Sequence, residues 1–456
     1  MPTSLLWFRR DLRIADHPAL LAALDSAGPE GGVVPVFVFD DRLWGPSGGP
    51  RRQFLLDCLA DLRESTGGAL VLRHGDPAEV VPALVAETGA TTVHVSADTG
   101  VYGRQRDEAV ERALGDVPLV RTGSPYLVTP GRVTKSDGTP FKVFTPFSRA
   151  WRAHGWRGPA QRPDTIAWQT GVPSDDPRPA PDLGNTALPP AGEAAAMAAW
   201  RQFRDVRLLG YDEGRNTPGT DGTSRLSAYL KYGCVHPRTL LADLASVEGG
   251  EEHVKRYTDE LAWRDFYADV LWHNPGTARD HLNAELAGIE YDSGAEAEEH
   301  VRAWEEGRTG FPIVDAGMRQ LRGEAYVHNR VRMIVASFFI KDLHQPWQRG
   351  ARYFMQHLVD GDLASNNHGW QWVAGTGTDA SPYYRVFNPS TQGKKFDPDG
   401  DYVKRWVPEL RDVPAKFVHE PWLSPDGLPA GYPEPVVDHA HERQVALDRY
   451  AAARDR

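Results

Sequence analysis

The stretch DGDLASNNHGWQW, residues 360 to 372, gathers two carboxylates, two adjacent amides and two tryptophans. The i, i+4, i+8 spacing of Asp362, Asn366 and Trp370 places them on one face of a helix, and Trp372 faces other neighbours. Polar side chains in a helical core need hydrogen-bonding partners. These partners are either protein groups of an internal network or a ligand such as a flavin or a nucleotide.

A second polar cluster, DGTSRLSAYLKYG, ends in a helical pattern. Thr223, Ser224 and Ser227 stand where a helix amino terminus presents backbone N–H groups and hydroxyls. Such a terminus binds a phosphate or diphosphate, and ordinary N-capping uses the same residues.

The stretch ELAWRDFYADVLW predicts a helix with a mixed face. Glu260, Trp263, Arg264 and Tyr267 share this face, whereas a plain core stripe would be apolar throughout. Aromatic planes beside a carboxyl group can stack a nucleobase and bond its edge. An exposed Glu–Arg pair next to core aromatics is the alternative.

A local excess of positive charge occupies the helical stretch from 319 to 352. Seven basic residues stand there against the two acidic residues Glu324 and Asp342: Arg319, Arg322, Arg330, Arg332, Lys341, Arg349 and Arg352. Such a patch can follow DNA phosphates, although most charge runs are solvated helix faces.

The elements that position these residues differ along the chain. Short β-branched runs alternate with helical patterns over residues 1–125 and predict a doubly wound parallel sheet. Ligands of such sheets bind beyond the carboxyl ends of the strands, here near Arg9, Asp40, His74 and Asp98, although no GxGxxG motif or P-loop follows any strand.

Two further regions follow the predicted sheet. Eight prolines between 159 and 190 predict a surface connector over 126–192. Helical spacing dominates residues 193–456, so we expect an all-helical second domain.

Composition limits the class of protein. The chain has 456 residues, 41% of them hydrophobic, and a net charge of −11, which argues against a protein that coats nucleic acid over its whole surface. Cys58 and Cys234 are far apart in the sequence and form no CxxC pair, so we expect neither a disulfide framework nor a cysteine-ligated metal. No apolar run approaches a membrane span, and we expect a cytoplasmic protein without a metal.

In their order and spacing these stretches resemble the DNA photolyase/cryptochrome family, most closely a bacterial class I cyclobutane pyrimidine dimer photolyase. The similarity also includes LLWFRRDLRIADHPAL, GYDEGRN, GRTGFPIVDAGMRQL, HNRVRMI and RVFNPSTQGKKFDPDGDYVKRWVPEL. It implies an amino-terminal α/β antenna domain, a helical FAD-binding domain, and light-driven repair of UV-damaged DNA by a monomer.

The resemblance also implies the residues that contact FAD. The diphosphate and ribityl region would be held by Tyr211, Thr223, Ser224, Arg225, Leu226 and Ser227. The rest of the flavin would be surrounded by Glu260, Arg264, Asn329, Arg332, Asp360, Gly361, Asp362 and Asn366. Photolyases typically carry Asn at the position of Asn366, plant cryptochromes Asp and insect cryptochromes Cys, so the chain is similar to a repair enzyme.

A catalytic lesion cavity is implied as well, formed by Glu260, Trp263, Asn329, Met333 and Trp372. Further contacts with DNA would come from Arg264, Tyr267, Arg330 and Arg385. Excited reduced flavin would donate an electron to the flipped-out dimer and recover it after the bonds between the bases split. Glu260 would bond the pyrimidine carbonyl, best as a protonated acid with a raised pKa.

Two alternatives to this activity are a (6-4) photolyase, whose histidine pair could be His328 and His368, and a cryptochrome photosensor without repair. Family members reduce their flavin through three tryptophans. Trp370 and Trp347 match the first two, and Tyr291 stands near the place of the third, with Trp304 as another candidate.

The family also implies an antenna chromophore. Tyr102 and Gly103 replace the Asn-Glu pair of folate-binding members, which disfavours methenyltetrahydrofolate. We expect 8-hydroxy-deazaflavin near Lys231 and Asp98, with FMN or no antenna as alternatives.

Overall fold

The computed structural model describes residues 2–378 and 384–454. The chain forms two compact units, each built from several segments. The first contains Met1–Leu183, Pro189–Val206 and Ser224–Pro275, and the second contains Gly184–Leu188, Arg207–Thr223 and Gly276–Arg456. These units divide the chain differently from the predicted domains 1–125 and 193–456, whose bounds stay a prediction.

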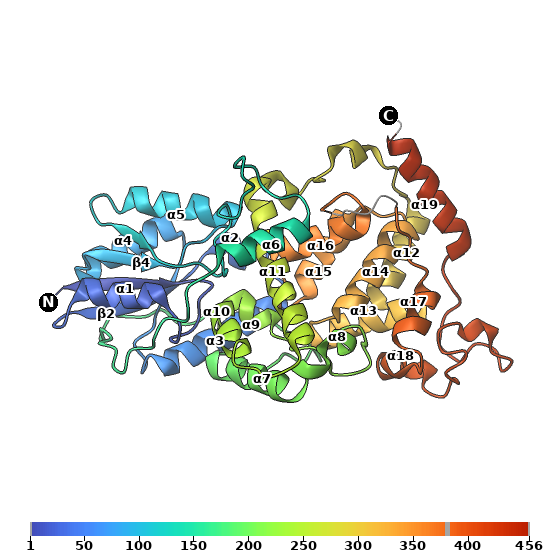
Figure 1. Cartoon of the computed structure of the whole chain (residues 1–456), viewed down its shortest axis with the longest axis horizontal. Coiled ribbons are helices and arrows are strands. Elements are labelled where there is room, and N and C mark those ends of the chain that lie inside the picture. The colour runs from blue at the N-terminus through green and yellow to red at the C-terminus, as the bar shows by residue number, and fades with distance from the viewer. Residues whose placement is uncertain (1, 379–383, 455–456) are drawn as a thin grey trace. The chain divides into compact units, whose positions relative to one another are not determined.

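A five-stranded parallel sheet forms the centre of the first unit (Figure 1). Its strands are β1 Thr3–Phe8, β2 Gly32–Phe39, β3 Val71–His74, β4 Thr92–Val95 and β5 Leu119–Arg121, in the order β3-β2-β1-β4-β5. The order reverses beside β1, where Leu5 pairs with Val34 on one side and Val93 on the other. The predicted doubly wound sheet is confirmed.

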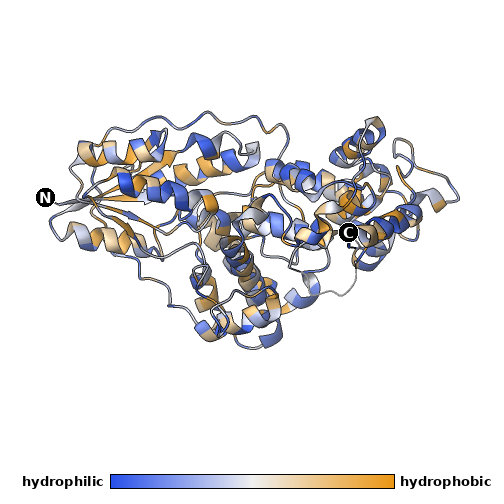
Figure 2. Ribbon diagram, turned by 90° about the horizontal axis from the view of Figure 1, so that it is seen from above, coloured by the Kyte–Doolittle hydropathy of each residue, from blue (hydrophilic) through white to orange (hydrophobic). Residues whose placement is uncertain are grey.

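Helices cover both faces of this sheet, as parallel strands require. Helix α1, Pro18–Ala27, packs on β1, β2 and β4. Helices α4, Pro77–Thr88, and α5, Val101–Ala113, share an apolar core with Leu5 and Trp7. Figure 2 shows the strands in the orange of hydrophobic residues between helices with mixed faces. All six residues of β1 are buried, because both faces are covered.

The first unit also contains seven further helices outside the sheet layer. They are α2 Asp41–Trp44, α3 Gly49–Ser65, α6 Phe144–His154, α7 Glu193–Val206, α9 Ser227–Tyr232, α10 Pro237–Leu244 and α11 Glu251–His273. Helix α6 lies within the connector predicted over 126–192, so this segment contains a helix as well as loops. Its apolar residues Phe144, Phe147 and Trp151 follow helical spacing and could have predicted it.

Helix α9 is tied to the loop after β1. The N–H of Leu12 donates to the carbonyl of Tyr232 at 3.1 Å, and Arg13 donates to the carbonyl of Gly233 at 3.0 Å. A Cβ at Gly233, whose φ is +72°, would lie 2.0 Å from the carbonyl oxygen of Arg10. Only glycine fits this close approach, which explains why α9 belongs to the same compact unit as the sheet.

The two cysteines also lie in the first unit. Cys58 of α3 and Cys234 are fully buried, and their sulfur atoms are 3.5 Å apart. Because 176 residues separate the two cysteines in the sequence, their proximity could not be predicted from it. Burial and the neighbouring thiol of Cys234 raise the pKa of Cys58 well above its usual value.

The second unit is helical among the residues that the structure describes. Its α-helices are α8 Tyr211–Gly214, α12 Ala295–Glu306, α13 Pro312–Glu324, α14 Asn329–Lys341, α15 Trp347–His357, α16 Leu363–Ala374, α17 Pro389–Phe396, α18 Asp401–Trp406 and α19 His439–Arg454. Helix α14 packs against α13, α15 and α16 (Figure 1). Its residues Phe338 and Phe339 are fully buried. In neither described range is any helix long and apolar enough to cross a membrane.

Candidate functional site

A charged pair lies at the entrance to α16 in the second unit. The guanidinium of Arg332 donates from Nη2 to Oδ2 of Asp360 at 2.8 Å. Asp360 is 7% exposed, and its other oxygen, Oδ1, is buried without a hydrogen-bond partner among the described residues. A buried carboxylate oxygen without a donor is costly, so this atom fits a ligand that supplies an N–H or O–H group.

Asp362 caps the amino terminus of α16, and Asn366 lies in its first turn. Asp362 is the N-cap, and its carboxylate accepts from the N–H of Ser365 at 3.1 Å, so it precedes the helix instead of lying on its face. The amide nitrogen of Asn366 donates to the carbonyl of Ala351 at 3.1 Å and to Oδ1 of Asn367 at 2.9 Å. These bonds fix the orientation of the Asn366 side chain, and Gly361 links its helix to Asp360.

The two indoles of α16 face different neighbours, as predicted. Trp370 is 4% exposed and packs edge-on against Phe354 at a centroid distance of 5.1 Å and Trp304 at 6.3 Å. A Cβ at Gly350 would lie 2.2 Å from the ring of Trp370, so α15 approaches this indole closely. Trp372 is half-buried and lines a polar cavity instead.

The residues predicted to pass electrons to Trp370 lie in different surroundings. Trp347 begins α15, one turn before Gly350, and its indole is buried. Tyr291 lies near Tyr384. Burial is the main cause of the raised pKa of Tyr384, and the phenol of Tyr291 raises that pKa further. Among the described residues no ring contact joins Tyr291 to Trp347. Trp304 does contact both Trp370 and Tyr353, the latter at 5.3 Å.

The start of α14 carries three predicted lesion or DNA contacts. Asn329 is exposed, and its amide lies 4.0 Å from the sulfur of Met333 one turn later. Arg330 donates to Oδ1 of Asn216 at 2.6 Å and lies 4.2 Å from the ring of Phe396. These contacts hold the polar side chains of Asn329 and Arg330 at the amino terminus of α14.

The histidines considered for a (6-4) activity serve the fold. His368 is fully buried, with Nε2 bonded to Oγ1 of Thr277 at 2.9 Å and Nδ1 to the carbonyl of Ala364 at 2.7 Å. His328 is 4% exposed and caps α14 by accepting from the N–H of Arg330. His368 therefore has no ring nitrogen left for a substrate.

The residues predicted to bind the diphosphate and ribityl region of FAD are divided between the two units. Ser224 belongs to the first unit and accepts from the hydroxyl of Tyr257 at 3.0 Å. Arg225 has a φ of +50°, a left-handed conformation that only a few non-glycine residues adopt, so the chain turns sharply before α9. Leu226 is buried and Ser227 is exposed. Tyr211 and Thr223 belong to the second unit, where Tyr211 begins α8.

The aromatic face of α11 exists as predicted, in the first unit. The indole of Trp263 stacks on Phe144 of α6, with a centroid distance of 3.8 Å and an angle of 7°. Tyr267 lies 5.3 Å from Trp263, and both rings are half-buried, as is Glu260. Phe144 covers one face of Trp263, a partner that sequence reasoning missed because it lies in the predicted connector.

Arg264 has a role that its position did not suggest. Its terminal nitrogens donate to the carbonyls of Pro125 at 2.7 Å and Leu230 at 3.0 Å, and its guanidinium lies 4.5 Å from the ring of Tyr126. The residue therefore joins α11 to α9 and to the start of the connector. Its contact with flavin or DNA stays a prediction.

Two buried acids on α11 were also missed. Oδ2 of Asp265 accepts from the N–H of Val128 and from the indole of Trp151, each at 3.0 Å, and Asp269 accepts from the N–H of Gly131 at 2.7 Å. Burial raises the pKa of Asp265 to about 6. These bonds hold the connector and α6 on α11.

The carboxyl ends of β1 and β4 carry an ion-pair network. Arg9 contacts Asp107 at 2.6 Å, and Arg106 contacts Asp107 at 2.8 Å and Asp98 at 3.2 Å. Burial opposes ionisation of Asp98, but Arg106 and its neighbours outweigh burial and lower its pKa. Lys231, the other predicted antenna residue, lies half-buried on α9.

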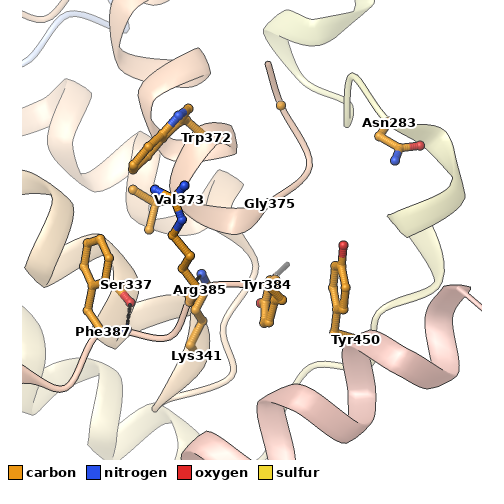
Figure 3. A pocket seen from close by; sticks show the side chains of 11 residues that line it. Asn283, Ser337, Lys341, Trp372, Val373, Gly375, Tyr384, Arg385, Phe387 and Tyr450 are labelled. Atoms are coloured by element: carbon orange, nitrogen blue, oxygen red, sulfur yellow. Dashed lines mark hydrogen bonds between the residues drawn. The ribbon is translucent and has the colours of Figure 1, made fainter. Parts of the chain in front are cut away.

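The predicted basic patch is partly neutralised. Arg319 pairs with Glu409 at 2.7 Å, Arg332 pairs with Asp360, and Arg349 pairs with Glu298 at 2.7 Å. Lys341 is only 3% exposed. Arg385 is exposed and lies beside Trp372 and Lys341 in the polar cavity (Figure 3).

The parallel α/β unit, and the helical unit in which Oδ1 of Asp360 is buried without a donor, are features of a ligand-binding protein. Comparison with known proteins identifies the family. Residues 4–165 match the DNA photolyase family description, and residues 257–452 match the FAD binding domain of DNA photolyase.

Full-length relatives agree with these matches. The chain is 41% identical over 480 residues to a deoxyribodipyrimidine photo-lyase of Halobacterium salinarum, with 99% of each chain covered. It is 39% identical over 479 residues to the enzyme of that name from Escherichia coli, with 100% of this chain and 99% of the relative covered. A bacterial class III photolyase from Agrobacterium tumefaciens superimposes with a TM-score of 0.93 at 37% identity, covering 100% of this chain and 98% of that one. The chain belongs to the DNA photolyase family.

Proposed function

We propose that this chain is a deoxyribodipyrimidine photo-lyase, an enzyme that uses light to split UV-induced cyclobutane pyrimidine dimers in DNA. The observation that carries the proposal is the end-to-end similarity to the enzymes of that name, at 41% and 39% identity. The buried histidine of α16 supports this substrate over a (6-4) lesion, because both ring nitrogens of His368 are bonded within the protein.

FAD fits the residues of the second unit. The orphan Oδ1 of Asp360 accepts a hydrogen bond, and Arg332 holds that carboxylate in place through its other oxygen. Asn366, oriented by its bonds to Ala351 and Asn367, presents its side-chain carbonyl. Asp362 and Asn329 complete this set. In the first unit, Ser224, Leu226 and Ser227 are proposed for the diphosphate region. Bound reduced FAD supplies the photoexcited electron that splits the dimer.

The chain's own residues hold and polarise the lesion. Trp263 and Trp372 offer half-buried indoles for stacking, which is worth roughly 1–3 kcal/mol per base. That gain offsets most of the few kcal/mol needed to extrude a damaged pair. We propose that Glu260, as a protonated acid, donates a hydrogen bond to a pyrimidine carbonyl, and that Asn329 and Met333 also contact the lesion. Tyr267, Arg330 and Arg385 bind the flanking strand.

Flavin reduction follows a route through buried rings. We place Trp370 first, because it is the buried indole of α16, the helix that Asp362 caps and that carries Asn366. Trp304 follows, with its centroid 6.3 Å from Trp370, and the half-buried Tyr353 is 5.3 Å further on. Trp347 is the alternative second step, since it lies on α15 one turn from Gly350. Tyr291 has no described ring contact with either tryptophan and is the weaker candidate.

Other parts of the proposal concern the antenna and the state of the protein. An 8-hydroxy-deazaflavin near Lys231 stays our preferred antenna, ahead of methenyltetrahydrofolate, FMN or none. Both predicted contacts are half-buried, and Asp98 pairs with Arg106. We also propose a cytoplasmic monomer.

The experiment that tests the function is loss of dimers from a UV-irradiated thymidine oligonucleotide under blue light. The purified chain, with its flavin spectrum recorded, is expected to repair dimers in light and not in the dark. A flavin-containing chain that leaves cyclobutane dimers intact would contradict the proposal. Repair of a (6-4) oligonucleotide in the same assay would identify the alternative enzyme, and repair of neither lesion would favour a photosensor.

A further inference from the structure

The residue after Asn366 in α16, Asn367, is an amide with both of its ends bonded inside the second unit. Its nitrogen Nδ2 donates to the carbonyl of Ala278 at 2.8 Å, and its oxygen Oδ1 accepts from Nδ2 of Asn366 at 2.9 Å. Asn367 is only 7% exposed. Because the two ends of an amide differ in hydrogen-bond chemistry, the bond to Ala278 determines which end faces Asn366.

The segment that carries Ala278 is held on α16 by further bonds that do not involve Asn367. Oγ1 of Thr277 is bonded to Nε2 of His368 at 2.9 Å, and Gln371 donates to the carbonyl of Thr277 at 2.9 Å. His368 and Gln371 are fully buried, so water does not compete for these bonds. The carbonyl of Ala278 is therefore a fixed acceptor for the nitrogen of Asn367.

Two oxygens in turn face the side-chain nitrogen of Asn366. They are Oδ1 of Asn367 and the carbonyl of Ala351, which accepts from Nδ2 of Asn366 at 3.1 Å. An inverted Asn366 amide would place its own oxygen against these two acceptors, without a donor. Asn366 is half-buried, and its Oδ1 receives no hydrogen bond within residues 2–378 and 384–454. Asn366 thus offers a ligand an acceptor and no donor.

An acceptor of this kind distinguishes the two redox states of a flavin. The ring nitrogens of the oxidised isoalloxazine are mostly acceptors, and reduction adds hydrogen to a ring nitrogen, which turns an acceptor into a donor. Hydrogen bonds to these nitrogens are one means by which a protein tunes the cofactor. An amide oxygen fixed toward the nitrogen that gains the hydrogen stabilises the reduced flavin and repels the oxidised one.

We propose that Asn367 is a positioning residue that fixes the Asn366 amide with its oxygen toward FAD, so that the site favours reduced over oxidised cofactor. The inference rests on the proposed function, in which Asn366 contacts the flavin and reduced FAD supplies the electron. Asn367 acts through Asn366, because its own amide is engaged within the protein.

The test measures the midpoint potential of bound FAD, which reports the ratio of the affinities for reduced and oxidised cofactor. Asn367→Leu removes the acceptor and fills a similar volume. It is expected to lower that ratio roughly fivefold, as for the loss of one hydrogen bond, and so to lower the two-electron potential by about 20 mV. Flavin absorption in equilibrium with a redox dye measures the potential. Asn367→Ala replaces Asn367→Leu if the latter does not fold, with the same shift expected.

A double-mutant cycle tests whether Asn367 acts through its neighbour. Asn366→Leu removes the amide that Asn367 orients. In that background Asn367→Leu is expected to leave the potential unchanged, because no amide remains to be positioned. A shift of the same size with and without Asn366 would overturn the proposal.

Thr277→Val is the matched control, because it removes one bond between the same two segments and leaves the Asn367 amide in place. It is expected to lower the melting temperature without changing the potential. An equal shift of the potential in Thr277→Val would show that loosening of the segment is the cause, and would overturn the proposal. Equal losses of affinity for oxidised and reduced FAD in Asn367→Leu would also overturn it.

The dimer-repair assay separates this inference from the function on which it rests. If the wild-type chain carries FAD and leaves cyclobutane dimers intact under blue light, the proposed function fails. If wild type repairs dimers and Asn367→Leu has the wild-type potential, only the positioning role of Asn367 fails.

Discussion

At the scale of single residues, the Arg332–Asp360 pair is the strongest indication of where FAD binds. Asp360 uses Oδ2 for Arg332 and keeps Oδ1 buried without a donor among the described residues. We predict that Asp360→Asn lowers FAD affinity at least roughly tenfold, because it removes a charge-assisted bond and leaves a partly buried guanidinium without its carboxylate. Flavin retention after dialysis, and titration of the apoprotein with FAD, measure the loss.

The control for this variant is Glu409→Gln. It breaks the ion pair with Arg319, which is 2.7 Å long, close to the 2.8 Å of the Arg332–Asp360 pair, and lies in the same unit. We expect it to keep wild-type flavin affinity. If both variants lose FAD equally, the effect is one of general stability and the assignment of Asp360 is wrong.

Another prediction at the residue scale concerns electron transfer. Trp304→Phe is expected to slow the photoreduction of oxidised flavin several-fold, because it removes the indole between Trp370 and Tyr353. Trp347→Phe tests the alternative second step. Transient absorption after a light pulse measures both variants, and an unchanged rate in Trp304→Phe with a slow rate in Trp347→Phe would contradict the route through Trp304. Repair from chemically reduced flavin is expected to survive in either variant.

At the scale of elements, the strands and long helices could be predicted from the periodicity and composition of the sequence. The elements and residues that each of them contacts could not be predicted. The β-branched runs over residues 1–125 predicted the strands of the sheet, and the spacing of Glu260, Trp263 and Tyr267 predicted the helix α11. Contacts between distant segments left no local signal. The bonds of Arg264 to Pro125, the stacking of Phe144 on Trp263, and the approach of Cys58 to Cys234 each depend on the tertiary fold.

The docking of α6 on α11 leads to a pH prediction. Asp265 is 2% exposed and its pKa is raised by burial to about 6, from 3.8. A raised pKa favours the protonated folded state, so this stability is present below pH 3.8 and is lost as pH rises through about 6. Relative to Asp265→Asn, wild type is therefore expected to lose up to about 3 kcal/mol of unfolding free energy between pH 4 and pH 7.

Urea unfolding followed by circular dichroism measures this difference. Glu252→Gln changes an exposed acid on the same helix, and its pH dependence is expected to follow that of wild type. Parallel curves for wild type and Asp265→Asn would show that Asp265 is ionised at little cost, and would contradict the role given to its burial.

At the scale of the whole molecule, net charge and local charge oppose each other. The chain carries −11, yet a member of this family that acts on damaged DNA must approach a polyanion. Ion pairs determine how many of the seven basic residues between 319 and 352 are available for phosphates. Arg319, Arg332 and Arg349 have carboxylate partners and Lys341 is buried, so Arg322, Arg330 and Arg352 remain.

This count predicts the salt dependence of DNA binding. The three available arginines of this stretch contribute about −3 to the slope of log K against log salt concentration, whereas all seven basic residues of the stretch would contribute about −6. Arg352→Gln, which changes an exposed side chain, is expected to reduce the slope by about 1, and Arg349→Gln is expected to leave it unchanged because Glu298 already neutralises that charge. Fluorescence anisotropy with a dimer-containing duplex from 50 to 300 mM salt, about the range over which such slopes are resolved, measures each value. A slope near −6 would mean that DNA displaces the carboxylate partners, and a flat plot would mean that binding is carried by stacking and base contacts instead of by these arginines.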